Sequence, residues 1–358
     1  MKYLNALNKI FGLGPHKMKK LLEYFGSSEA IWKAGFSELS ASGIGEKLSE
    51  RILFEKNSID PEKEWDKLDK ENIRILTLAD SDYPSLLKEI SNPPYIIYVK
   101  GTIDFNQFPM VAVVGSRKYS AYGSQVATTL ARDLTKAGII IVSGMALGID
   151  SFAHRGALDG QGKTVAVLGN SLDDKNIYPR NNFNLSREII ENGALLSEYP
   201  IETIAGKLTF PARNRIIAAL ALGTVVIEAG EKSGALITAQ MALEYNREVF
   251  ATPGSIFSPE SLGTHNLIRT GAKLVTGVKD ILEELNLAKA DACKKPIIKN
   301  PDTLEEKKIL NILGSEPIHI DNVSKLAKLQ IAQVAAVLVM MEIKGWVKNI
   351  GGQNYILL

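Results

Sequence analysis

Short apolar runs rich in β-branched residues alternate with amphipathic stretches through the middle of the chain. In one such stretch, residues 123–137, Val126, Leu130 and Leu134 recur about one helical turn apart. Strands that are apolar along their whole length, alternating with helices, are typical of a parallel sheet covered on both faces. We therefore predict an α/β fold with a mostly parallel sheet over residues 66–285. The predicted strands are Ile73–Leu78, Tyr95–Val99, Met110–Val114, Ile139–Val142, Thr164–Leu168, Leu195–Ser197, Thr224–Ile227, Glu248–Ala251 and Lys273–Val275.

Two similar glycine turns divide the helical stretches of residues 1–65. The first is Phe11–Gly14 and the second is Ser42–Gly45, and an amphipathic helix follows each. This is the pattern of a helix-hairpin-helix, whose turn can present backbone N–H groups to a phosphate. Basic and acidic residues nearly balance over residues 1–70, which favours a compact SAM-like packing domain over DNA contact.

The C-terminal part of the chain has the pattern of a winged helix. A proline-containing and lysine-containing stretch over 286–302 predicts a linker, and the winged helix follows over 303–358. Its predicted third helix offers no arginine, lysine or asparagine to base edges, which favours protein docking or a structural role. The predicted elements are helices at Leu304–Leu313, Ile320–Leu329 and Ile331–Ile343 and a hairpin formed by 345–347 and 355–357.

Composition narrows the class of protein. A chain of 358 residues, 45% hydrophobic and 23% charged, is expected to form two or three globular domains. No apolar run reaches the ~18–20 residues that span a bilayer, and the N-terminus lacks the pattern of a signal peptide. One cysteine, Cys293, and four scattered histidines provide no disulfide framework or metal-ligand spacing. We predict a cytoplasmic protein without metal or cofactor, and its net charge of +2 limits any DNA surface to a local patch.

The strand-to-helix loops of a parallel sheet meet at one edge, where ligands bind. The loop after Met110–Val114 begins with Gly115, Ser116 and Arg117. A dinucleotide-binding loop would have glycine at the position of Arg117, so that the backbone could approach a pyrophosphate. The arginine offers a fork of donors instead, which suits an external phosphate backbone. The alternative is an ordinary solvated arginine.

Three further loops reach the same edge. Ser143–Asp150 contains two glycines close to a helix start, a pattern that favours an anion nest, and His154 follows as an expected core or capping histidine. Gly206–Arg215 combines Lys207, Phe210 and two arginines, the charge and ring that a single strand needs, with Phe210 equally suited to the core. Ser233 and Gly234 are predicted to begin a helix whose N–H groups face an anion.

No catalytic arrangement emerges from these loops. The segment Ala157–Thr164 matches a relaxed Walker A string, but it leads from a predicted helix into a predicted strand. A phosphate-binding loop runs in the opposite order, so that the helix N-terminus faces the phosphates. We therefore expect no nucleotide-hydrolysing site in this segment.

Taken together, the motifs of the chain resemble those of the DNA-processing protein A family, also called DprA or Smf, of bacterial natural transformation. The resemblance covers essentially the whole chain. It rests on Asp82–Pro84, Pro93–Gly101, Val114–Arg117, Ser143–Asp150, Phe210–Arg215, Glu228–Gly230, Ser233–Ala235 and Ala251–Gly254.

The resemblance implies an extended Rossmann-like core that forms a homodimer, binds single-stranded DNA in a positive pocket and loads the RecA recombinase, without being an enzyme. By position, Arg117 and Lys207 look like the phosphate-binding pair, Phe210 like the base-contacting ring, and Ser233–Ala235 like the backbone phosphate site. The residues expected at the DNA-binding site are Gly115, Ser116, Arg117, Gly144, Met145, Lys207, Phe210, Arg213, Asn214, Ser233, Gly234 and Ala235.

A nucleotide phosphoribohydrolase of the lysine-decarboxylase-like fold is the alternative. Such enzymes carry the pattern P-G-G-x-G-T-x-x-E. When that pattern is laid on Gly234–Thr238, Thr238 takes the place of the glutamate and the preceding glycine pair is missing. Hydrolysis would then lack its carboxylate, which favours the DNA-binding interpretation.

Overall fold

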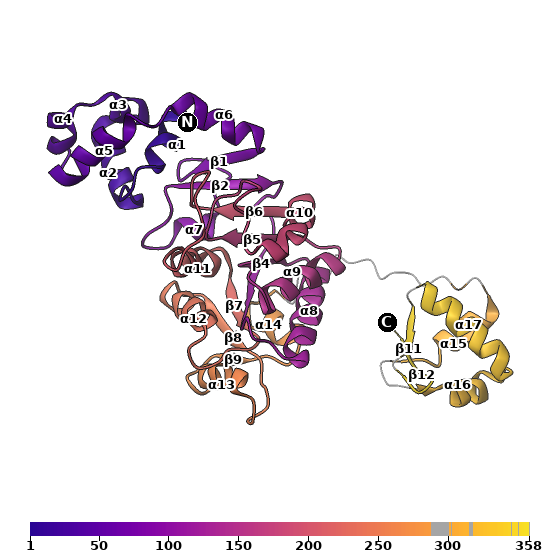
Figure 1. The fold of residues 1–358 in the computed structure, drawn as a ribbon. Coiled ribbons are helices and arrows are strands. Elements are labelled where there is room, and N and C mark those ends of the chain that lie inside the picture. The colour runs from indigo at the N-terminus through magenta and orange to yellow at the C-terminus, as the bar shows by residue number, and fades with distance from the viewer. Residues whose placement is uncertain (288–300, 302, 315–317, 345, 350, 358) are drawn as a thin grey trace. The chain divides into compact units, whose positions relative to one another are not determined.

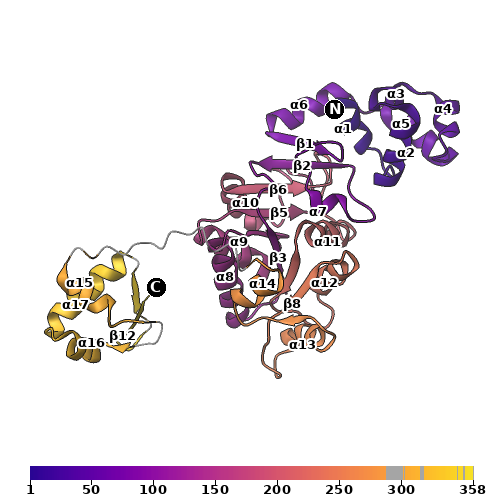
Figure 2. The same ribbon diagram turned by 180° about the vertical axis from the view of Figure 1, so that it is seen from behind.

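The computed structural model describes residues 1–287, 301, 303–314, 318–344, 346–349 and 351–357. Its contacts divide into two units, Met1–Asp291 and Ala292–Leu358. The first unit contains a nine-stranded sheet with helices on both faces (Figures 1 and 2). Its strands are β1 Ile73–Thr77, β2 Ile96–Gly101, β3 Met110–Val114, β4 Ile140–Ser143, β5 Thr164–Leu168, β6 Gly193–Ser197, β7 Gly223–Val226, β8 Glu248–Ala251 and β9 Lys273–Leu274.

The strand order is β1-β2-β6-β5-β4-β3-β7-β8-β9. The strands from β6 to β9 in this order pair in parallel, while β1 and β2 add an antiparallel edge. The mostly parallel sheet predicted from the apolar runs is therefore confirmed. Each predicted strand is present, with ends that differ by at most two residues.

Two apolar layers hold helices against the sheet. One layer packs α8, α9 and α14 on β3, β4 and β7 through residues such as Val113 and Leu134. The other packs α7, α11 and α12 on the opposite face through residues such as Ala112 and Leu220. These helices are α7 Ser85–Lys88, α8 Ala121–Lys136, α9 Ile149–Asp159, α10 Phe183–Glu191, α11 Thr209–Leu220, α12 Gly234–Glu244, α13 Leu262–Arg269 and α14 Val278–Glu284.

One of these helices, α11, begins earlier than the pattern predicted. Its first residues, Thr209–Arg215, belong to the stretch Gly206–Arg215 that we predicted as a loop, and it ends at Leu220. Pro211 lies in its first turn, where the backbone N–H groups have no partner within the helix and a proline is tolerated. Phe210 consequently projects from a helix and not from a free loop.

The helices of the N-terminal segment continue the core of the sheet. They are α1 Lys2–Asn8, α2 Pro15–Phe25, α3 Ser28–Lys33, α4 Phe36–Ala41, α5 Glu46–Lys56 and α6 Pro61–Lys70. Their apolar side chains form one cluster with residues of β2 and α10. The buried Tyr98 hydroxyl donates to Asn5 (2.8 Å) and accepts from the Asn8 amide (3.1 Å). Helix α6 crosses position 65, where the predicted domain ends, because Asp60 caps it and Pro61 opens its first turn.

The second unit has the elements expected of a winged helix. They are α15 Leu304–Leu310, α16 Ile320–Ala327, α17 Ile331–Ile343, and a three-stranded sheet of β10 Ile318–His319, β11 Val347–Asn349 and β12 Asn354–Leu357. Strand β10 was not predicted. The linker prediction and Cys293 fall on residues outside the described set, apart from Asn286, Leu287 and Pro301. Among the described residues no single helix is long and apolar enough to span a bilayer, and α16 and α17 pass that test only as a pair bent by 109°.

His154 lies in the core, which is one of the two roles, core or capping, that we predicted for it. Its side chain is fully buried on α9, and Nδ1 lies 2.7 Å from the Thr164 hydroxyl. That hydroxyl donates to the Ile141 carbonyl, so it accepts from His154 and assigns the ring proton to Nδ1. Burial, with a smaller contribution from nearby Arg213, lowers the pKa of His154 to about 3.

This shift predicts a pH-dependent stability. Below pH 6.5 the unfolded chain takes up a proton on His154 that the folded chain does not bind until the pH nears 3. The free energy of unfolding should therefore fall by up to about 1.4 kcal/mol per pH unit across this window. Urea unfolding at pH 7, 6 and 5 measures the slope, and His154→Gln should flatten it. Equal slopes in both proteins would contradict a buried neutral histidine.

Candidate nucleic-acid interface

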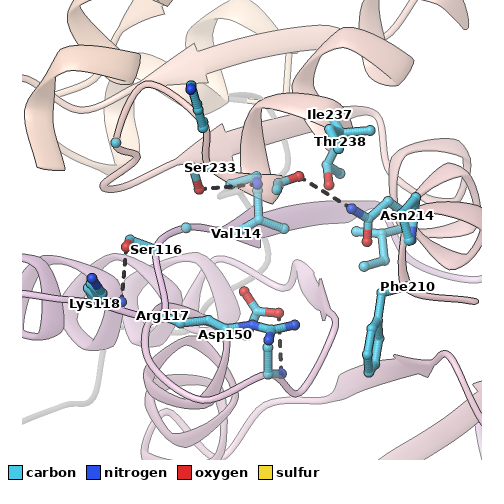
Figure 3. Close-up of a pocket in the computed structure, with 18 of the residues that line it drawn as sticks. Val114, Ser116, Arg117, Lys118, Asp150, Phe210, Asn214, Ser233, Ile237 and Thr238 are labelled. Atoms are coloured by element: carbon cyan, nitrogen blue, oxygen red, sulfur yellow. Dashed lines mark hydrogen bonds between the residues drawn. The ribbon is translucent and has the colours of Figure 1, made fainter. Parts of the chain in front are cut away.

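A crevice opens where the strand order reverses. Strands β4, β5 and β6 follow on one side of β3, and β7 and β8 lie on the other, so the loops after β3 and β7 diverge at the carboxyl edge. This is the position where open α/β sheets bind ligands. The crevice has a volume of about 490 Å³ and is lined by the loops after β3, β4 and β7 and by the first turns of α11 and α12 (Figure 3).

The loop after β3 supplies two exposed cations. A side chain at Gly115 would collide with Ile149, 2.7 Å from the added Cβ, so the loop can pass α9 only with glycine there. Ser116 is buried, donates its N–H to the Glu228 carbonyl (2.6 Å) and accepts from the Lys118 N–H (3.0 Å). These bonds shape the loop, and the side chains of Arg117 and Lys118 project toward the crevice from it.

Two aromatic rings and an arginine form the next wall. The Arg117 guanidinium lies 5.4 Å from the centre of the Phe210 ring, a cation–π contact. The Tyr178 ring packs on the Phe210 ring, with 5.7 Å between the two ring centres. Both residues line a smaller hollow beside the crevice. Phe210 is half-buried and Tyr178 is exposed, so the pair is accessible to a flat ligand.

The start of α12 completes the crevice. The Ser233 hydroxyl accepts from the Ala235 N–H (3.3 Å), which confirms the predicted N-cap. Asn214 reaches across from α11 and donates to the Gly234 carbonyl (3.3 Å), tying the two walls together (Figure 3). The positive end of the α12 dipole faces the cavity with the backbone of Ser233–Ala235, a suitable position for an anion.

Gly144, Met145 and Arg213 do not have the positions expected of direct DNA contacts. Met145 is fully buried, and the N–H groups of Gly144 and Ala146 donate to the Asp150 carboxylate at 3.2 and 3.4 Å. The expected anion nest is therefore occupied by a side chain of the protein itself. DNA contact by Gly144 and Met145 stays a prediction.

Arg213 is 5% exposed and donates to the carbonyls of Gly144 (2.6 Å) and Val167. Burial lowers its pKa to about 10, while the Asp150 charge acts in the opposite direction. Burial also raises the pKa of Asp150. Arg213 thus supports the floor of the crevice, because Nη1 is held by the two backbone oxygens and Nε donates to the Asn214 side-chain oxygen (3.2 Å).

Lys207 lies in the turn before α11, three residues ahead of Phe210, and is exposed. It does not line the crevice itself, so its side chain can meet only a ligand that extends beyond the cavity. The charges around the crevice are mixed, with Lys232 beside Glu231 on one rim and Glu260 close by. No group of three or more metal-ligating side chains occurs in the described part of the chain.

A family model for DNA recombination-mediator protein A matches residues 74–286, and one for the DprA winged helix domain matches residues 295–353. The chain belongs to this family. It is 36% identical to the Smf protein of Synechocystis over 99% of this chain and 98% of that protein. It is 46% identical to the DNA processing protein DprA of Streptococcus pneumoniae over 58% of this chain and 73% of that protein.

Two solved structures from the family are similar in fold. The X-ray structure of Streptococcus pneumoniae DprA matches 79% of this chain and 98% of its own, with a TM-score of 0.69 and 37% identity. The Helicobacter pylori DNA processing protein A, described for its single-stranded DNA binding mode, matches 60% of this chain and 96% of its own, with a TM-score of 0.54 and 34% identity. The extended Rossmann-like core and the winged helix are thus confirmed.

The residues predicted for the site do not include Lys118, Lys232 or Tyr178, which the fold brings to the crevice or to the smaller hollow beside it. Tyr178 comes from the loop after β5, and only packing places it on Phe210. Lys118 and Lys232 line the cavity beside residues that were predicted. Both lysines belong to the loops singled out from the sequence, and their position at the sheet edge was an available signal.

The different burial of two arginines leads to a prediction. Arg213→Ala leaves the carbonyls of Gly144 and Val167 without this donor and removes the cation near Asp150, so unfolding free energy should fall by about 3–5 kcal/mol. Arg117→Ala removes an exposed loop charge and should change it by no more than about 0.5 kcal/mol. Urea unfolding at pH 7 compares the two variants. Similar losses in both would mean that Arg213 is not a supporting residue.

Proposed function

We propose that the crevice binds single-stranded DNA and that the protein passes the strand to the RecA recombinase during natural transformation or recombination. The observation that carries the proposal is the contact between Arg117 and Phe210 at the mouth of the crevice. A cation beside an accessible ring is suited to a strand, since charge neutralises phosphates and the ring stacks on any base. The N-terminus of α12 adds a second anion site across the cavity.

Family membership supports the same function. The Helicobacter pylori relative is described as binding single-stranded DNA. RecA loading, the homodimer and a cytoplasmic location rest on the family resemblance, and we include them in the proposal on that basis. We propose that neither a metal nor a cofactor takes part, and that the protein is not an enzyme.

A nucleotide phosphoribohydrolase is the alternative. Thr238 lines the crevice on α12, where those enzymes have a glutamate. Fluorescence anisotropy with labelled oligo-dT, with labelled duplex and with unlabelled nucleoside monophosphate as competitor separates the two functions. We expect tight binding to the strand alone. Displacement of the strand by the free nucleotide, together with its hydrolysis, would favour the enzyme.

Salt dependence tests the phosphate contacts. Each phosphate contact on a single strand contributes about −0.7 to the slope of log K against log salt. Arg117→Ala and Lys207→Ala should therefore each flatten the slope by about that amount and weaken binding to every sequence, and the double variant should lose most binding. Lys136→Ala is the matched control, because Lys136 is exposed at the end of α8, away from the carboxyl edge. Unchanged slopes in both single variants would place the strand elsewhere.

Phe210→Ala tests stacking. Loss of one stacked base contact costs about 1–3 kcal/mol and does not depend on base identity. Affinity should therefore fall similarly for dT, dC and mixed strands, as measured by anisotropy, while the far-UV circular dichroism stays unchanged. If the variant unfolds instead, Phe210 belongs to the core and the ring is not a base contact.

A further inference from the structure

Residues 1–70 precede both family matches, which begin at residues 74 and 295. Within them the two glycine turns form an internal repeat. Gly12 and Gly14 recur as Gly43 and Gly45, 31 residues later. At the same spacing, Lys20 on α2 corresponds to Arg51 on α5. The first glycine of each turn has a positive φ, +85° at Gly12 and +76° at Gly43, whereas the second glycines differ, with φ of −76° at Gly14 and +88° at Gly45. Each turn is followed by a helix that carries one of the two cations.

Each of the two cations contacts the glycine turn of the other repeat. Lys20 Nζ donates to the Gly43 carbonyl (2.8 Å), and Arg51 Nη1 donates to the Phe11 carbonyl (3.3 Å). A Cβ on Gly43 would come within 2.7 Å of Lys20 Nζ, so glycine allows the lysine to lie on the turn. The reciprocal contacts bring both turns and both cations onto one surface.

Two phenylalanine rings stand out from this surface. Phe11 is 76% exposed and Phe54 is 81% exposed, whereas Leu13 and Ile44 between the glycines are buried. The Arg51 guanidinium lies 5.2 Å from the centre of the Phe11 ring. Phe54 follows Arg51 by three residues on α5 and shares its face of the helix. The apolar residues needed for packing are thus inside, and the two rings add nothing to the core.

We propose that Phe11, Lys20, Arg51 and Phe54, the paired-turn surface, form a second contact for single-stranded DNA. The ligand follows from the chemistry: rings stack on the faces of unpaired bases, a guanidinium stacks or pairs with phosphate, and lysine adds charge. In a duplex the base faces are stacked on neighbouring bases, so the two rings have no exposed base face to contact. Glu55 accepts from the Phe11 N–H (3.0 Å) and lies 4.0 Å from Arg51 Nε, so it fixes the turn and orients the guanidinium. The inference rests on the proposed function, since the same strand would occupy both sites.

The test uses the full chain with Phe11→Ala and Phe54→Ala combined. Anisotropy compares a dT strand of about 6 nucleotides, near the lower limit of known single-strand sites, with one of about 30. We expect the dissociation constant for the long strand to rise at least fivefold, with that for the short strand unchanged. Phe11→Tyr and Phe54→Tyr combined keep both rings and should leave the dissociation constant for the long strand unchanged.

Phe108→Ala is the matched control. Phe108 is also an exposed phenylalanine near a cation, 5.7 Å from Lys163 Nζ, but it precedes β3 at the edge of the sheet away from the crevice. It should leave both dissociation constants unchanged. An unchanged long-strand affinity in the double alanine variant overturns the inference, as does an equal loss for both lengths or a loss confined to duplex DNA. If Arg117→Ala has no effect while the double variant weakens long-strand binding, the crevice proposal fails and the paired-turn surface stands.

Discussion

Arg213 is the constraint on which the crevice depends. Its guanidinium lies at the carboxyl edge of the sheet and bonds the backbone of the β4 loop to the end of β5. The Asp150 carboxylate accepts from the N–H groups of Gly144 and Ala146 in the same loop. A buried cation and a buried carboxylate are costly unless their hydrogen bonds are satisfied, so this loop has little freedom to rearrange. The floor beneath Arg117 and Phe210 is rigid as a result.

A preorganised floor matters for a ligand as flexible as a single strand. Binding must offset the entropy lost when the strand is ordered, and a protein that also had to order its own loops would bind more weakly. Here the Ser116 bonds, the Ser233 cap and the contact from Asn214 to Gly234 set the walls through contacts within the protein itself. The exposed cations and rings that remain are of the kind that bind without regard to base sequence.

The helical N-terminal segment shows the same division between support and contact. Asn5 and Asn8 fasten it to Tyr98 of β2, and its leucines and isoleucines continue the core. The two rings and two cations of the paired-turn surface take no part in that packing. A segment anchored in this way can extend the footprint of the core on a long strand, since the anchor keeps its position relative to β2. The winged helix, by contrast, presents Val339 and Met340 on α17, an uncharged face.

Features encoded within a few neighbouring residues were predictable from the sequence. Strands such as Met110–Val114, the Ser233 cap and the helix Ile331–Ile343 follow from periodicity and capping, which are local. The sheet edge that gathers the loops followed from the handedness of the crossovers. Only the tertiary structure distinguished Arg213 from Arg117, because burial depends on residues far away in the chain. For the same reason it alone showed that Tyr178 packs on Phe210 and that Asp150 occupies the expected nest. It alone also showed that Lys20 and Arg51 each contact the turn of the other repeat.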